Sequence, residues 1–160
     1  MPITRTQNVG VTDTTNDLSS KAITITAPAA DSLIITGLAV DKSSGAITVP
    51  TGFTLANDYV SANVSGALAF KVSDGTETTI TWAWADVPGT GGVTVRAAVY
   101  TGLTTTPLDV KAEANSGATA VTSQTTGTTA TTAQADELAI AFVVADTGFN
   151  IETGRSWSQG

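Results

Sequence analysis

Apolar residues along this chain recur at every second position, in short runs bounded by Gly, Pro, Asp and Ser. This period is typical of β-strands, because alternate side chains of a strand point to opposite faces of the sheet. Stripes of helical period are hard to find. The pattern predicts strands over Ala22–Ala27, Ser32–Val40, Ala46–Val49, Leu55–Ser61, Ala67–Val72, Thr76–Ala85, Val93–Thr101, Leu108–Ala112 and Leu138–Ala145.

Three features predict how these strands associate. Ser32–Val40 is almost continuously apolar, which indicates a strand central to its sheet or covered on both faces, and we expect Ala22–Ala27 to pair with it. The dipeptide Asp74-Gly75 favours positive φ and predicts a hairpin between its flanking strands, within a meander over the middle of the chain. Leu138–Ala145 is equally apolar, so we expect it to lie beside Ser32–Val40.

These elements predict an all-β fold, an antiparallel two-sheet β-sandwich of jelly-roll or Ig-like type with little or no helix. We expect residues 1–20 to form an N-terminal arm or edge segment and residues 21–160 to form the sandwich. The sequence stops soon after Trp157 without a closing strand. We therefore expect the final strand or strands to come from residues or chains beyond this sequence.

Composition excludes most familiar catalytic machinery. The 160 residues contain no Cys and no His, which removes thiolate nucleophiles, imidazole bases and Cys/His zinc sites. The formal charge of -7 disfavours binding to nucleic acid or to anionic membranes. Only 13% of the residues are charged, so the surface should be polar but weakly charged. No catalytic residue and no cofactor are expected.

Acidic residues offer the remaining candidates for chemistry. Asp136 and Glu137 precede an apolar strand, and Asp109 and Glu113 flank Lys111, but solvated strand ends and exposed charge pairs explain both sets. Calcium is an alternative, since it binds oxygen ligands in Gly-containing loops. The candidate ligands are Asp146, Asn150 and Glu152, and a second set is Asp41 with Ser43 and Ser44. Turn formation explains these residues without a metal.

Aromatic residues raise the alternative of glycan binding, because aromatic faces stack on sugar rings. Trp82, Trp84 and Trp157 are the candidate stacking residues, with Tyr59 as a fourth member. Trp82 and Trp84 are two positions apart in one predicted strand and so share a face with Ile80. In a chain with so few aromatics, we expect that face to belong to the core.

The order of motifs resembles β-sandwich modules of tailed-phage virion proteins and of related prophage or bacterial surface proteins. The resemblance lies in "DSLIITGLAV", "VPTGFT", "TWAWA", "AAVYTGLTTTPLDVKA" and "ADELAIAFVVAD". Its positions are Pro50, Gly52 and Phe53, then Tyr100 and Gly102, then Pro107 and Asp109, and Leu138 onward. Thr101 departs from the pattern, in which a basic residue is frequent.

The resemblance implies a non-enzymatic virion structural protein on the particle surface, as capsid decoration or as a tail or fibre component. Its partners would be major capsid or tail proteins and further copies of itself as a homo-oligomer, with no nucleic acid and no membrane. The amino terminus does not read as a secretory signal, which fits assembly in the host cytoplasm and release by lysis. The alternative is a carbohydrate-binding or adhesin module that recognises a host surface glycan.

Overall fold

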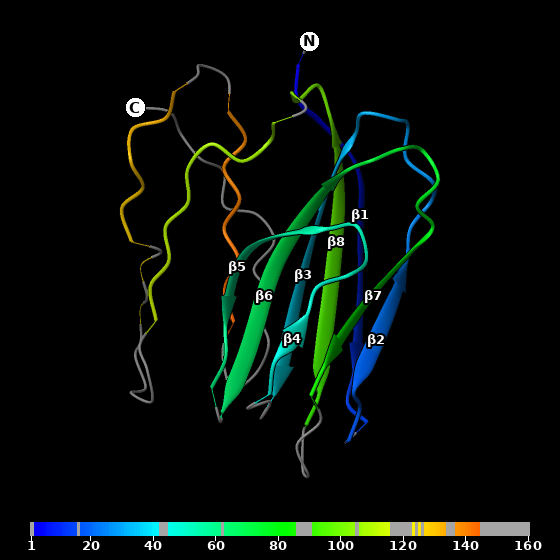
Figure 1. Ribbon diagram of the computed structural model, residues 1–160, viewed down its shortest axis with the longest axis vertical. Helices are drawn as coiled ribbons and strands as arrows, with labels where there is room; N and C mark the ends of the chain where they lie inside the picture. The colour runs from blue at the N-terminus through cyan, green and yellow to red at the C-terminus, as the bar shows by residue number, and fades with distance from the viewer. Residues whose placement is uncertain are drawn as a thin grey trace.

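Eight strands among the described residues form two antiparallel sheets (Figure 1). The structure is a computed structural model that describes residues 2–15, 17–41, 45–61, 63–85, 91–104, 106–115, 123, 125, 127–133 and 137–144. The strands are β1 Thr4–Asp13, β2 Ser20–Thr24, β3 Leu33–Asp41, β4 Ile47–Thr48, β5 Thr54–Tyr59, β6 Val64–Val72, β7 Thr79–Trp84 and β8 Val93–Thr101. The orders are β1-β8-β3-β6-β5 and β2-β7-β4. No helix occurs in this part of the chain, and the predicted all-β, two-sheet sandwich is confirmed.

The core lies between the two sheets and is filled by alternate residues of the strands. On β7 the side chains of Ile80, Trp82 and Trp84 are all buried, whereas Thr79 and Thr81 are exposed. The interpretation of Trp82 and Trp84 as core residues is therefore confirmed. The buried cluster is Ile23, Ile25, Ile34, Leu38, Val40, Ala67, Ala69, Ile80, Trp82, Trp84, Val93, Val95, Ala97 and Val99.

Strand β3 is the middle strand of the larger sheet and is covered on both faces, as its apolar sequence predicts. Thr36 faces the core, where its hydroxyl accepts a hydrogen bond of 3.0 Å from Trp82 Nε1 on β7. Gly37 faces the other way, because neighbouring residues of a strand alternate. On that outer face the ring of Phe142 lies directly against Gly37.

The predicted hairpin at Asp74-Gly75 is wrong. Gly75 does adopt a positive φ of 92°, but β6 belongs to the five-stranded sheet and β7 to the three-stranded sheet. The chain therefore turns a corner from one sheet to the other, and the middle of the chain is not a meander. A two-residue hairpin would have placed β7 beside β6, whereas crossing over puts the Trp82 and Trp84 side chains into the core from the opposite layer.

The predicted pairing of Ala22–Ala27 with Ser32–Val40 is also wrong. Strand β2 pairs with β7, and β3 pairs with β6 and β8, so the two segments lie in different sheets. Both are apolar because both contribute to the core, with Ile23 on β2 and Ile34 on β3 buried. Apolar periodicity shows that a strand reaches the core but does not show from which sheet.

The two ends of the described chain are built differently, and only the C-terminal part departs from the strands that we predict. Residues 1–20 contain β1, an edge strand that pairs with β8 from Thr4 to Asp13. Leu108–Ala112 was predicted as a strand and is not one. The predicted strand Leu138–Ala145 is wrong over residues 138–144, and Ala145 lies outside the described residues. This segment does meet β3, but across its outer face and not along an edge.

Candidate functional site

The structure describes two of the three tryptophans that are candidates for glycan stacking, and both are buried. Trp82 is 0% and Trp84 is 4% exposed, so neither indole face can meet a sugar. Trp157 lies outside the described residues. Tyr59 is 38% exposed near the end of β5, separated from the buried pair. The structure therefore assembles no aromatic platform from the described members of this set.

The candidate calcium ligands Asp146, Asn150 and Glu152 lie outside the described residues, as do Ser43 and Ser44. Asp41 is described, and its backbone N–H donates a hydrogen bond to the carbonyl of Gly92. Within the described residues, no group of three or more acidic side chains is placed to hold a metal ion. No helix there is long and apolar enough to cross a membrane.

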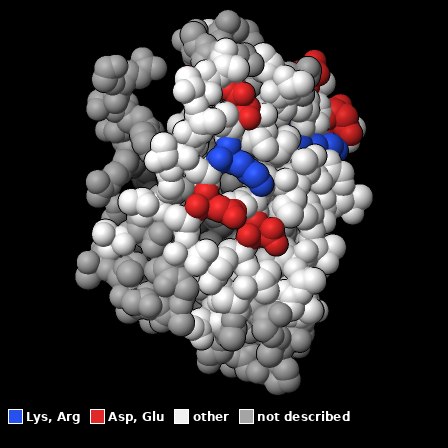
Figure 2. Space-filling model, turned by 60° about the vertical axis from the view of Figure 1, so that its left-hand side comes forward, with Lys and Arg blue, Asp and Glu red and all other residues white. Residues whose placement is uncertain are grey.

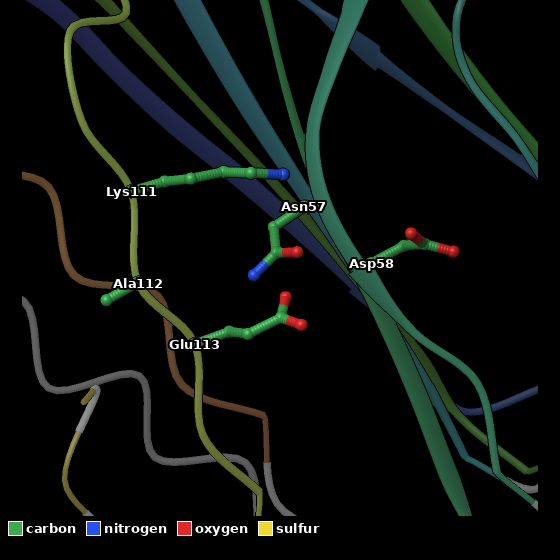
Figure 3. Close-up of a pocket in the computed structure, with 5 residues that line it drawn as sticks. All are labelled: Asn57, Asp58, Lys111, Ala112 and Glu113. Carbon is green, nitrogen blue, oxygen red and sulfur yellow. The ribbon is translucent and has the colours of Figure 1, made fainter. Parts of the chain in front are cut away.

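Two of the predicted charged residues, Lys111 and Glu113, lie beside β5, and Asp109 contacts another segment. Lys111 Nζ donates a hydrogen bond of 2.7 Å to the backbone carbonyl of Ala56 on that strand. Asp109 accepts a hydrogen bond of 2.7 Å from the backbone N–H of Ala133. Glu113 follows along the same segment (Figure 3). Because a segment that covers an edge strand hinders pairing with other chains, the contact of Lys111 with Ala56 protects this edge.

A cavity of about 440 Å³ separates β5 from this segment and is lined by Asn57, Asp58, Lys111, Ala112 and Glu113. In Figure 3 the side chains of Asn57 and Glu113 point into the space, and the carboxylate of Asp58 points away from it. Catalysis by paired carboxylates requires two acids that face the same reacting group. The two carboxylates here do not face each other, so the lining offers hydrogen bonds but no catalytic pair.

Six large apolar side chains among the described residues are exposed, and they lie on two segments of the chain. Three are on β5 or directly after it and three are on the segment that follows β8. They are Leu55, Tyr59, Val60, Leu108, Ile140 and Val143, each at least 38% exposed. We call these six residues the apolar side. Figure 1 shows the segment after β8 running on the β5 side of the sandwich, and Figure 2, which brings this side forward, shows basic and acidic side chains at its centre with uncharged residues around them.

Beside the apolar side, two glycines form a seat on the outer face of the larger sheet. A Cβ on Gly37 would lie 2.5 Å from the ring of Phe142, and a Cβ on Gly66 would lie 2.5 Å from Val144 Cγ2. Any larger residue would displace these side chains. We call Gly37 and Gly66 the glycine seat. Sequence analysis missed it, although a glycine inside a strand often marks the close approach of another segment.

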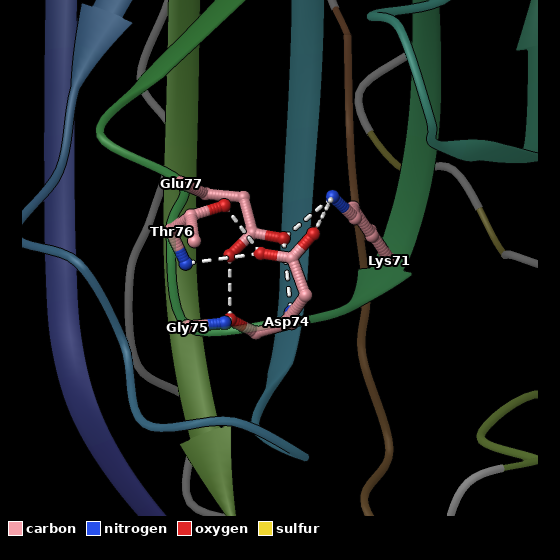
Figure 4. Close-up of polar contacts among 6 residues, drawn as sticks. Lys71, Asp74, Gly75, Thr76 and Glu77 are labelled. Atoms are coloured by element: carbon pink, nitrogen blue, oxygen red, sulfur yellow. Dashed lines mark hydrogen bonds and ion pairs between the residues drawn. The ribbon is translucent and has the colours of Figure 1, made fainter.

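The corner between β6 and β7 contains a polar cluster that the sequence did not predict (Figure 4). Lys71 Nζ lies 2.6 Å from Glu77 Oε1, and Ser73 Oγ donates a hydrogen bond of 2.6 Å to Glu77 Oε2. The backbone N–H of Asp74 donates to the same carboxylate at 3.2 Å. Burial opposes ionisation of Glu77, but these donors outweigh it and lower its pKa to about 2. The cluster stabilises the corner and contacts no cavity described above.

Comparison with known proteins finds no matching family model, no matching curated protein and no matching solved structure. The features of the described residues that remain are the apolar side, which is exposed, and the glycine seat, which holds Phe142 and Val144 of the same chain.

Proposed function

We propose that the chain is a non-enzymatic structural protein displayed on the surface of a tailed-phage particle, as capsid decoration, with a tail or fibre position as the second placement. The observation that carries the proposal is the apolar side, because exposed large apolar residues on two segments of the β5 side favour contact with another protein. A subunit held on a particle needs such a contact region and a stable, inert body.

Two further properties support this role. The low fraction of charged residues leaves a polar, weakly charged exterior, which suits a body crowded against other subunits. The sequence also resembles modules of virion proteins, through turn motifs such as Pro50-Thr51-Gly52-Phe53. In the structure Gly52 has a φ of 80°, a conformation that glycine adopts without strain.

The apolar side would face the major capsid or tail protein, or a neighbouring copy of the chain. Leu55, Tyr59 and Val60 lie on β5 or directly after it, and their exposed side chains can be covered by a partner. Burying apolar surface at roughly 25 cal/mol per Å² makes such a contact favourable. Particle assembly in the host cytoplasm would bring these surfaces together.

Glycan stacking would need exposed indole faces, and both Trp82 and Trp84 are buried. No described observation favours a sugar ligand over a protein partner.

The test is whether the chain belongs to particles. Particles would be purified by density gradient from a lysate of the cells that encode the chain, and its copy number measured against the major shell protein by quantitative mass spectrometry. We expect many copies in a fixed ratio to the shell protein. A chain that is abundant in the lysate but absent from intact particles would overturn the proposal.

Residue-level support would come from rebinding to particles that lack the chain. Replacing Tyr59 and Val60 together by Ser removes two members of the apolar side, and we expect the dissociation constant for the particle to rise at least about tenfold, the factor that 1.4 kcal/mol represents. The matched control replaces Thr24 and Thr26 by Ser, since both are exposed outside the apolar side. The control should bind like the unmodified chain, and equal binding by both variants would show that the apolar side is not the contact.

A further inference from the structure

Strand β7 has a pairing partner along most of one side but along only a small part of the other. On one side β2 pairs with it from Thr79 to Ala83. On the other side β4 pairs only with Ala83 and Trp84. Among the described residues, β7 therefore has no strand beside residues 79–82 on the β4 side (Figure 1).

The backbone groups of Thr79 and Thr81 point toward this open side. The backbone N–H of Trp84 donates to the residue just before β2 at 2.9 Å, so Trp84 and every second residue before it face β2. The residues between them face the opposite way. Ala85 fits this alternation, because its N–H donates to the residue just before β4 at 3.0 Å. Thr79 and Thr81 thus each present an N–H donor and a C=O acceptor to the open side, and no described residue bonds to these groups.

Proline at position 50 explains why β4 does not fill this side. Thr48 lies opposite Ala83, so a longer β4 would place Pro50 opposite Thr81. Proline has no backbone N–H, and Pro50 therefore cannot donate to the carbonyl of Thr81. The carbonyl of Pro50 is used in a turn instead, where it accepts the N–H of Phe53 at 3.0 Å. The chain then leaves for β5 in the other sheet.

A cavity of about 240 Å³ lies between this turn and β7. Its lining is uncharged and consists of Pro50, Thr51, Phe53, Thr79, Ile80 and Thr81. We call the space that these six residues line the β7 slot. Because β7 bounds it on one side and the turn bounds it on the other, the slot is open to a single extended segment and not to the edge of a second folded sheet.

We propose that the β7 slot binds a short extended segment of another protein, which pairs as an added strand with Thr79 and Thr81. Such segments take their affinity from main-chain hydrogen bonds and their specificity from pockets for alternate side chains. Residues 79–82 extend over about 13 Å at about 3.3 Å per residue, which suits a segment of about four residues. The uncharged lining favours uncharged side chains, and Phe53 and Ile80 favour a small apolar one on the inward side. The residue opposite Thr81 must carry an N–H, so it is not proline.

The slot is separate from the apolar side. Its residues come from β7 and from the turn after β4, whereas the apolar side comes from the β5 region and from the segment after β8. The inference therefore goes beyond the proposed function and does not rest on it. A slot that binds no segment would leave particle binding through Tyr59 and Val60 unaffected, and the reverse also holds.

Nuclear magnetic resonance titration of the full chain tests the slot with a defined probe. The probe is an acetylated and amidated peptide, Thr-Val-Thr-Val-Thr, which continues the alternation of β4 without its proline. We expect saturable shifts of the amide resonances of Thr79, Ile80 and Thr81, with a dissociation constant on the order of 1 mM. Unshifted resonances of these residues up to about 5 mM peptide would overturn the proposal.

The matched control is the same peptide with N-methyl groups on its threonines. In the slot the valines would point inward, so the threonines would direct their N–H groups toward β7. Methylation removes these donors and keeps the side chains. The dissociation constant should rise at least about fivefold, because main-chain hydrogen bonds are lost. Equal binding of both peptides would show that side chains alone make the contact, and strand addition would be rejected.

Two variants of Thr81 make the same comparison from the side of the protein. Thr81→Pro removes the N–H that faces the open side, at a strand edge where proline is tolerated, and it should weaken binding of the unmethylated peptide at least about fivefold. Thr81→Val keeps the backbone groups and should bind like the unmodified chain. If Thr81→Pro does not fold, the two peptides on the unmodified chain decide the question. A folded Thr81→Pro that binds normally would refute the proposal.

A dilution series without peptide separates another protein from a second copy of this chain. We expect the amide resonances of Thr79 and Thr81 to be independent of protein concentration. Shifts of these resonances with protein concentration alone would show that the slot takes a segment of a second copy, and this would overturn the assignment to another protein.

Discussion

The hydrogen bond between Trp82 and Thr36 ties the two sheets together at the centre of the core. Thr36 Oγ1 accepts from Trp82 Nε1 at 3.0 Å and donates to the backbone carbonyl of Arg96 at 2.9 Å. Thr36 is 1% and Trp82 is 0% exposed, so water cannot replace either partner. Thr36→Val keeps nearly the same shape and removes only the hydroxyl. The perturbation thus isolates the polar contact from the packing.

The expected cost follows from which groups lose their partners. The buried indole N–H is left without an acceptor, which costs about 1–3 kcal/mol, and the bond to the Arg96 carbonyl contributes about 1 kcal/mol more. The free energy of unfolding should therefore fall by about 2–4 kcal/mol. With a urea dependence of about 2 kcal/mol per M, the unfolding midpoint should fall by about 1–2 M.

Urea unfolding followed by far-ultraviolet circular dichroism measures this change without relying on the tryptophan signal. Thr81→Val is the matched control, because Thr81 is the exposed neighbour of Trp82 on β7. The control should stay within about 0.5 kcal/mol of the unmodified chain. If Thr36→Val cost no more than Thr81→Val, the hydrogen bond would not join the sheets and the reasoning would be wrong.

Three further predictions concern the corner, the seat and the β5 edge. Glu77→Gln should cost about 1–3 kcal/mol at neutral pH, because the carboxylate has a folded pKa of about 2 against an ordinary 4.5. This contribution is present above about pH 4.5 and is lost as pH falls toward 2, so acid titration of stability should be flatter in the variant. Gly37→Val should displace the ring of Phe142 and increase the rate of proteolysis within residues 138–144 severalfold, while the β-sheet circular dichroism signal is retained. An unchanged cleavage rate would show that Gly37 does not hold this segment. Lys111→Met should increase self-association measured by light scattering, because it unblocks the β5 edge, and an unchanged mass would show that Lys111 does not protect it.

The sequence alone predicts only part of the apolar side and the glycine seat. Apolar residues such as Leu55 and Ile140 read as ordinary strand positions, and nothing local distinguishes an exposed one from a buried one. A glycine beside an apolar run, such as Gly66, can indicate the close approach of another segment. The residue that packs on it, Val144, is distant in sequence, so the sequence does not identify it. The apolar side and the glycine seat are both products of long-range contact.

The sequence by itself determined the all-β class, most strand positions and the inward face of β7, because a period of two is a local property of the chain. Gly75 likewise took the positive φ that its dipeptide predicts. Only the tertiary structure decided which sheet each strand joins. Strands β6 and β7 flank a turn suited to a hairpin and yet lie in opposite layers, where Trp82 of β7 reaches Thr36 of the larger sheet.

The same distinction applies to the segment 138–144. Its apolar character matches that of β3, but the free backbone edges of the larger sheet belong to β1 and β5, and β3 is already paired on both sides. No ladder position beside β3 remains for it. The segment therefore meets β3 across the face of the sheet, where Phe142 packs over Gly37. This position follows from the pairing of β3 with its two neighbours and not from the local sequence.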